Sequence, residues 1–180
     1  MELFIFDLDG TLIDSRDDIA DSVNLALAAL GFPTIPVAAA YEFIGEGVFN
    51  LMRRALDASR GAAPDEALVD RGVAAFKEQY ADNCLVKTRL YDGVAETLAA
   101  LGEFRKAVVT NKPRDFSVKI LDALGVASHF EMTVGGDTYP ERKPHATPIV
   151  ETAKTLGVEL ADCVMIGDSR ADILAARNAG

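Results

Sequence analysis

Four short apolar runs, each ending in polar residues or glycine, constrain the fold of this chain more than any other feature. They are residues 3–6, 106–110, 131–135 and 163–167. A helical pattern precedes each of the last three runs, over residues 93–101, 115–124 and 147–156. Strands that alternate with helices are typical of parallel βαβ units. The sequence therefore predicts an α/β fold, with a doubly wound parallel sheet that binds its ligands beyond the carboxyl ends of the strands.

The stretch between the first and second runs breaks this alternation, because it carries helical patterns and no convincing strand. A first helix is expected to be capped by Ser15, a second to follow Gly47, and a third to start at Pro64. The sequence thus predicts a helical insert within the α/β core. The expected insert comprises residues 15–83, and the expected core comprises residues 1–14 and 84–180.

The composition is that of an ordinary globular protein, with 49% hydrophobic and 26% charged residues. The formal net charge is −10, and no basic stretch stands out that would follow a phosphate backbone, so nucleic acid is not an expected partner. No apolar run reaches the length of a membrane span, so no membrane partner is expected. Cys84 and Cys163 fit neither a disulfide framework nor a metal site, which favours a cytoplasmic location.

Paired carboxylates end the first run. Asp7 and Asp9 would share one face of an extended chain, and Gly10 then allows a sharp turn. Such a pair can hold a magnesium ion and can divide the roles of nucleophile and general acid/base in phosphoryl transfer through an aspartyl-phosphate. An Asp-Gly turn without catalytic function is the plain alternative for this motif taken alone.

The other three runs also deliver polar groups to the same edge of the predicted sheet. Thr110 and Asn111 could hold phosphoryl oxygens, and the ammonium of Lys143 could neutralise phosphate charge. Asp168 and Asp172 would face one spot, although capping of the next helix explains an aspartate there equally well. An acid pair, a hydroxyl, a lysine and a second acid pair at one edge together favour a phosphoryl-transfer site.

These segments resemble, in the same order, the four motifs of the haloacid dehalogenase superfamily of phosphatases. The matching segments are residues 7–15 (DLDGTLIDS), 110–113 (TNKP), 143–145 (KPH) and 167–172 (GDSRAD). The likeness covers the whole chain, and three further segments resemble the phosphoglycolate phosphatase branch in particular: residues 44–47 (IGEG), 135–137 (GGD) and 175–180 (AARNAG). The resemblance implies that the helical insert is a mobile cap over the site, and that at least one more strand follows Gly180.

The resemblance also implies a role for each acidic residue. Asp7 is the expected nucleophile and a magnesium ligand, and Asp9 is the expected acid/base, whose backbone carbonyl also faces the metal. Asp168 is the third expected protein ligand, with Asp172 close by. Charge supports a metal independently: three of these carboxylates and Lys143 sum to about −2, which would repel a phosphate dianion unless a divalent cation is bound.

The resemblance implies the substrate contacts as well. Thr110 and Asn111 would hold the phosphoryl group, and Lys143 would bridge it to the nucleophile. The loop with Gly45 and Gly47 would face the site, although it could equally be a plain turn between two helices. The complete set of expected substrate-binding residues is Gly10, Thr110, Asn111, Lys143, Gly45 and Gly47. In the insert, Arg53 could reach a substrate carboxylate, but an ion pair with Asp57 along the helix is the favoured interpretation.

The expected function is that of a magnesium-dependent phosphatase of a small phosphate monoester, for which the resemblance favours 2-phosphoglycolate. A phosphomutase or a sugar phosphatase of the same superfamily is the alternative, since a mutase differs only in passing the phosphoryl group to a second hydroxyl instead of water. A phosphoacceptor signalling domain is disfavoured by the helical insert and by the acid pair that follows the lysine. The sequence does not predict the oligomeric state.

Overall fold

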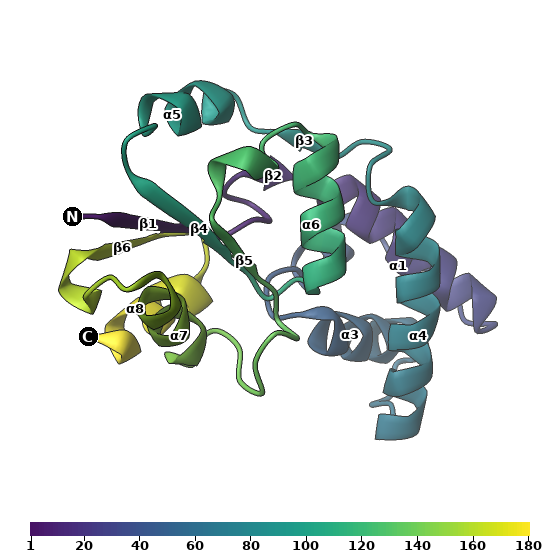
Figure 1. The fold of residues 1–180 in the computed structure, drawn as a ribbon. Helices are drawn as coiled ribbons and strands as arrows, with labels where there is room; N and C mark the ends of the chain where they lie inside the picture. Colours follow the sequence, from purple (N-terminus) through teal and green to yellow (C-terminus); the bar gives the residue numbers. More distant parts are fainter. The chain divides into compact units, whose positions relative to one another are not determined.

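A four-stranded parallel sheet lies at the centre of the α/β part of the computed structural model, which describes residues 1–180. The strand order is β5-β4-β1-β6, and the strands lie side by side in Figure 1. Their bounds are Leu3–Phe6 (β1), Arg105–Val109 (β4), Met132–Val134 (β5) and Cys163–Ile166 (β6). In register, Phe6 pairs with Val108 on one side and with Ile166 on the other, so the strands end level with one another. The predicted α/β class with a parallel sheet is confirmed.

Helices cover both faces of this sheet. Leu3 and Ile5 point to the face where α7 (Thr147–Leu156) and α8 (Arg170–Ala179) complete a buried core. Phe4 points to the other face, where its ring meets that of Phe104, which follows α5 (Val94–Ala100), at 5.3 Å between centroids. The remaining helix, α6 (Arg114–Ala123), packs against β5. Two short 3₁₀ helices precede β5 and β6: η1 (Ala127–His129) and η2 (Leu160–Asp162).

The local signals predict the four strands of the sheet and the helices α5, α6 and α7 to within about a residue at either end. The helix over Thr147–Leu156 has the predicted bounds, and Gly157 ends it in the left-handed conformation with φ of +66°. Because glycine has no Cβ, it adopts this conformation without the steric penalty of other residues.

The chain forms two compact units, of which the second is Ser15–Thr88 and the first comprises Met1–Asp14 and Arg89–Gly180. The second unit is all-helical. It contains α1 (Arg16–Ala29), α2 (Val37–Tyr41), α3 (Val48–Arg60) and α4 (Glu66–Asn83). The first helix packs against each of the others, and the buried core between them includes Val23, Leu27, Met52, Leu56 and Phe76.

The second unit differs in detail from its expected form. Ser15 occupies the N-cap position of α1, but its side chain makes no capping hydrogen bond, contrary to expectation. The third expected helix begins at Glu66 instead of Pro64, because the carboxylate of Asp65 accepts the Leu68 amide at 2.8 Å and caps it there. The short helix α2 was not expected from the sequence.

A buried carboxylate holds the last residues of the second unit. Asp18 in α1 accepts hydrogen bonds from the backbone N–H groups of Lys87 and Thr88 and from the Thr88 hydroxyl, at 2.7–3.0 Å. These bonds hold residues beyond the expected insert end at 83 within the second unit. A two-stranded antiparallel ribbon of the first unit flanks the insert, formed by β2 (Ile13–Asp14) and β3 (Arg89–Leu90). None of the helices combines the length and the apolar character needed to span a membrane.

Candidate active site

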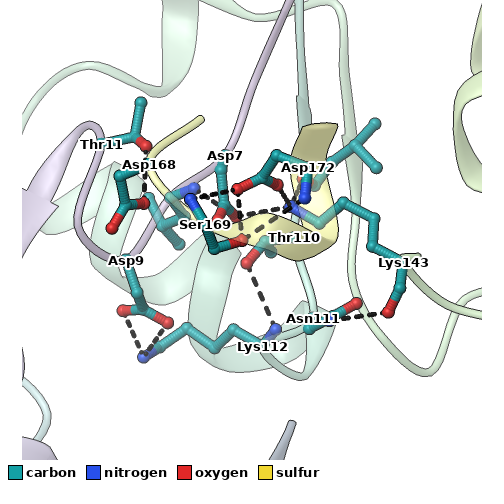
Figure 2. Close-up of polar contacts among 12 residues, drawn as sticks. Asp7, Asp9, Thr11, Thr110, Asn111, Lys112, Lys143, Asp168, Ser169 and Asp172 are labelled. Carbon is teal, nitrogen blue, oxygen red and sulfur yellow. Dashed lines mark hydrogen bonds and ion pairs between the residues drawn. The ribbon is translucent and has the colours of Figure 1, made fainter. Parts of the chain in front are cut away.

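The carboxyl ends of all four strands contribute polar side chains to one place in the first unit. Asp7 directly follows β1, Thr110 follows β4, and Asp168 stands two residues beyond the end of β6. Lys143 comes from the loop between β5 and α7, and Asp172 from the first turn of α8. Figure 2 shows these side chains converging, as the parallel topology requires.

Lys143 is the central cation of the cluster. Its ammonium lies 2.9 Å from Asp7 Oδ1, 2.5 Å from Asp172 Oδ1 and 2.7 Å from the carbonyl oxygen of Val109. An ammonium has three protons, so these three acceptors use all of them. The side chain is only 2% exposed, which makes the ion pairs strong and fixes the ammonium between the two carboxylates.

Burial raises the pKa of Asp7 from 3.8 to about 6. The Lys143 ammonium lowers this pKa, the nearby Asp172 carboxylate raises it, and hydrogen bonds from Lys143 and from the Leu8 amide, the latter at 2.7 Å, lower it further. Desolvation is the largest of these effects. Asp7 is therefore a desolvated carboxylate whose position is fixed by a cation, the environment expected of a carboxylate nucleophile.

Asp172 uses its two carboxylate oxygens for different purposes. Oδ1 binds Lys143, while Oδ2 accepts hydrogen bonds from the backbone N–H of Ser169 at 2.9 Å and from the Ser169 hydroxyl at 2.5 Å. Ser169 in turn accepts the Asp172 amide, so the two residues form a capping box at the start of α8. The capping explanation of this aspartate is therefore confirmed, and its role as a metal ligand stays a prediction.

Three carboxylates could hold a metal ion together. Oxygen atoms of Asp7, Asp168 and Asp172 all lie within 4.8 Å of one another. Asp168 is held in place by the Thr11 hydroxyl, which donates to its Oδ1 at 3.0 Å. Hard carboxylate oxygens are the ligands that Mg²⁺ prefers, so this donor set fits a magnesium ion.

Gly10 packs closely against one of these three carboxylates, that of Asp168. Its φ is +85°, and a Cβ on it would lie only 2.3 Å from Asp168 Oδ2. Any side chain at this position would displace Asp168 as well as strain the backbone. The structure thus gives Gly10 a clear role beside the acidic cluster, in addition to the substrate contact expected for it.

Asp9 lies outside the three-carboxylate group. Its side chain pairs with Lys112, whose Nζ is 2.9 Å from Oδ1 and 3.2 Å from Oδ2. Thr110 is buried, and its hydroxyl oxygen accepts the backbone N–H of the same lysine, Lys112, at 3.2 Å. Lys112 therefore contacts both the Asp9 side chain, which is the expected acid/base, and the Thr110 hydroxyl, which is expected to hold a phosphoryl group.

Gly10, Thr110, Asn111 and Lys143, four of the expected substrate-binding residues, belong to the first unit. The side-chain amide of Asn111 donates to the carbonyl oxygen of Lys143 at 3.0 Å, so this group holds the Lys143 loop in place. Gly45 and Gly47 belong to the second unit, where both have positive φ in the turn before α3. Both glycines allow this turn, and their contact with a substrate stays a prediction.

In α3 of the second unit, the guanidinium of Arg53 lies over the ring of Phe49, 5.0 Å from its centroid. It does not form the expected ion pair with Asp57. At an exposed position, a cation above an aromatic ring is about as favourable as an ion pair. This contact joins Arg53 to the residue four positions earlier, whereas the expected ion pair joins it to the residue four positions later. Arg54 lies over Phe43 in the same way, at 4.4 Å.

Sequence reasoning missed three residues of this site. Ser169 could have been found, because Ser-x-x-Asp before a helix is a readable capping signal. Thr11 follows the Asp-Leu-Asp-Gly segment, but its contact with Asp168 joins residues far apart in the chain. Lys112 belongs to the segment TNKP, but no local pattern reveals that its ammonium reaches Asp9.

Comparison with known proteins identifies the family of this chain. The family of haloacid dehalogenase-like hydrolases matches residues 1–180. A phosphoglycolate phosphatase from Colwellia psychrerythraea is 41% identical over 182 aligned positions, covering 99% of this chain and 80% of that protein. One from Neisseria meningitidis is 38% identical, covering 97% of this chain and 75% of that protein.

A solved structure from Haemophilus somnus, described as a predicted phosphoglycolate phosphatase, superposes with a TM-score of 0.93 at 36% identity. The alignment covers 100% of this chain and 82% of that one. The chain therefore belongs to the haloacid dehalogenase-like hydrolases, and the resemblance drawn from its motifs is confirmed. The predicted enzyme class, a phosphoric monoester hydrolase, is confirmed by these curated relatives.

Proposed function

We propose that this protein hydrolyses a small phosphate monoester, 2-phosphoglycolate, in a magnesium-dependent reaction through an aspartyl-phosphate on Asp7. The observation that supports the mechanism best is the buried triad in which the Lys143 ammonium lies between the carboxylates of Asp7 and Asp172. This arrangement keeps a desolvated carboxylate in place with one cation beside it, where a phosphoryl group can be attacked and its charge neutralised.

Asp7, Asp168 and Asp172 would hold the magnesium ion, and the backbone carbonyl of Asp9 is its expected fourth protein ligand. When bound, the ion supplies positive charge that lets a phosphate dianion approach these carboxylates and polarises its P–O bonds. The Thr11 hydroxyl and the capping box at Ser169 fix two of the three ligands, Asp168 and Asp172, before any ligand binds.

In the first chemical step, a carboxylate oxygen of Asp7 attacks phosphorus and forms an O–P bond. The bond from phosphorus to the alcohol oxygen breaks, and Asp9 in its protonated form gives its proton to that oxygen. In the second step, Asp9 as a carboxylate takes a proton from water as the water oxygen attacks phosphorus. The bond to Asp7 then breaks, and inorganic phosphate leaves with both carboxyl groups restored.

The remaining residues of the cluster bind and orient. The buried Thr110 hydroxyl would donate to a phosphoryl oxygen, and Lys143 would bridge the phosphoryl group to Asp7. Asn111 would act indirectly, because its amide fixes the loop that carries Lys143. Attack in line with the leaving oxygen depends on these groups being fixed in advance.

The all-helical unit Ser15–Thr88 would act as a cap that excludes water and selects small substrates. The names of the curated relatives support 2-phosphoglycolate as the substrate. A cytoplasmic location fits the two free thiols of Cys84 and Cys163, which suit a reducing compartment.

The proposal is tested by measuring kcat/KM for 2-phosphoglycolate and for glucose 6-phosphate, with magnesium and with excess chelator. We expect magnesium-dependent turnover that favours 2-phosphoglycolate. A preference of about tenfold or more for the hexose phosphate, which corresponds to about 1.4 kcal/mol of transition-state binding, would instead identify a sugar phosphatase or a mutase. Full activity in excess chelator would contradict the metal requirement.

A further inference from the structure

The segment over residues 175–180, which resembles the phosphoglycolate phosphatase branch, has no part in the reaction described above. It forms the C-terminal end of α8, where the side chain of Asn178 donates from Nδ2 to the carbonyl oxygen of Pro144 at 2.9 Å. A carbonyl oxygen only accepts hydrogen bonds, so the amide nitrogen of Asn178 is the atom that faces it. This bond joins α8 to the residue that directly follows Lys143.

Helix α8 contacts the same loop at a second point. In the first turn of the helix, the Asp172 carboxylate lies 2.5 Å from the Lys143 ammonium. Asn178 lies six positions further along the helix, a rise of about 9 Å, and it binds the main chain next to Lys143. One helix therefore holds the ammonium of this lysine with one side chain and the backbone beside the lysine with another.

The carbonyl group of Lys143 itself is held from a different element. The Asn111 amide, just beyond β4, donates to this carbonyl oxygen at 3.0 Å, as Figure 2 shows. Two successive carbonyl groups of the loop thus each accept a side-chain amide. Pro144 has no backbone N–H, so its carbonyl is the main-chain group through which a hydrogen bond can hold this residue.

The helix that carries Asn178 is itself firmly fixed. Ala175 is fully buried in the core beneath the sheet, and the capping box of Ser169 and Asp172 fixes the first turn. A hydrogen bond from such a helix holds the loop in place relative to the sheet. Asn178 lies at the surface, so its bond does not serve to satisfy a buried polar group. What the bond contributes is the placement of the loop.

We propose that Asn178 is a positioning residue for Lys143, because its bond to the Pro144 carbonyl sets where the backbone of the lysine lies. The inference rests on the proposed function and deepens it, since this lysine is the group that bridges the phosphoryl group to Asp7. Without the bond the loop moves more freely, and the ammonium meets the phosphoryl group in a less accurate position. A misplaced ammonium weakens both substrate binding and stabilisation of the transition state, so KM and kcat should both change.

The test replaces Asn178 with leucine, which has a similar size and no hydrogen-bond donor. In Asn178→Leu we expect kcat/KM for 2-phosphoglycolate to fall about fivefold or more, with a lower kcat as well as a higher KM. We also expect the affinity for inorganic phosphate, titrated calorimetrically with magnesium present, to fall about fivefold. Asn178→Gln keeps the amide and should recover part of both losses. Asn83→Leu is the matched control, because it removes a side-chain amide that donates to the carbonyl of Gln79 in the second unit, and it should keep the wild-type values.

A double variant shows whether Asn178 acts through the lysine. In the Lys143→Met background, Asn178→Leu should leave the phosphate affinity unchanged, because the group that it positions is absent. An equal loss of phosphate affinity in both backgrounds would contradict the inference. So would an Asn178→Leu protein that binds phosphate as the wild type does, whether or not its stability in urea changes. If the wild type binds phosphate but does not hydrolyse 2-phosphoglycolate, the proposed function is wrong, whereas the phosphate affinities still decide the role of Asn178.

Discussion

The Lys143 ammonium lies 2.5 Å from a carboxylate oxygen of Asp172, and both side chains are only 2% exposed. This contact joins the loop after β5 to the first turn of α8, so one ion pair connects two of the strand ends that build the site. The same ammonium contacts Asp7 as well, so it reduces the repulsion between the two buried carboxylates of Asp7 and Asp172.

Lys143→Met should therefore destabilise the metal-free protein as well as abolish catalysis. Removing the cation leaves two buried carboxylates without a counter-charge, and breaking a buried pair in this way costs about 3–5 kcal/mol. Urea unfolding in chelator at neutral pH measures the loss. Lys106→Met is the matched control, since that buried lysine donates only to the carbonyls of Leu101 and Phe104 and should cost less. Equal losses in the two variants would contradict this account.

Asp7→Asn should be inactive and yet more stable than the wild type without metal. Because burial raises the pKa of Asp7 from 3.8 to about 6, the folded state binds its proton more tightly than the unfolded chain does. The free energy of unfolding therefore falls as pH rises from about 4 to about 6, and the penalty is fully present at pH 7. The variant removes that penalty, worth about 2–3 kcal/mol.

Urea unfolding of the wild type and of Asp7→Asn in chelator, at pH 4 and at pH 7, tests the direction of this difference in the free energy of unfolding. The advantage of Asp7→Asn should be large at pH 7 and small at about pH 4, where the folded wild-type carboxyl is protonated and the unfolded one is partly protonated. Added magnesium should narrow or reverse the difference, because the wild type binds the ion better. A variant less stable than the wild type in chelator at pH 7 would show that the buried charge is not unfavourable.

Asp9→Asn should keep the fold and lose turnover. Without proton transfer to the leaving oxygen and from the attacking water, steady-state hydrolysis of 2-phosphoglycolate should fall by about 10²–10⁴-fold. Asp162→Asn, which changes an exposed aspartate near the N-terminal amine, serves as control and should retain full activity. If Asp9→Asn stays within a few-fold of the wild-type rate, Asp9 is not the acid/base.

Gly10→Ala should weaken magnesium binding. The added methyl group would lie 2.3 Å from Asp168 Oδ2, so the carboxylate must move, and the magnesium concentration for half-maximal activity should rise about tenfold or more. Gly125→Ala is a close control, because its φ of +73° gives similar backbone strain with nothing within 4 Å of the new Cβ. Both variants should lose stability, but only the first should need more magnesium.

Much of the α/β fold could be predicted because its signals are local. An apolar run such as Leu3–Phe6 indicates a buried strand, and parallel topology then brings the residues after each strand to one edge. Asp7, Thr110 and Asp168 could be placed together by this argument alone. The same argument identified no partner for any single side chain.

What could not be predicted depends on contacts between distant residues. The pairing of Lys112 with Asp9 and the bond from Asn111 to the Lys143 carbonyl both depend on side-chain directions that no periodicity encodes. The end of the second unit at Thr88 has a similar cause. A carboxylate far earlier in the chain, Asp18, fixes it, while the sequence near the boundary carries no matching signal.

The central claim, covalent catalysis by Asp7, is tested most directly by trapping the intermediate. Asp9→Asn with p-nitrophenyl phosphate and magnesium should release one equivalent of nitrophenol and then stall, because this leaving group needs no proton but water still needs a base. Acid quenching, digestion with trypsin and mass spectrometry should place a phosphoryl group on Asp7 within the peptide that ends at Arg16. A peptide without phosphate, from an enzyme that still releases nitrophenol, would contradict the account.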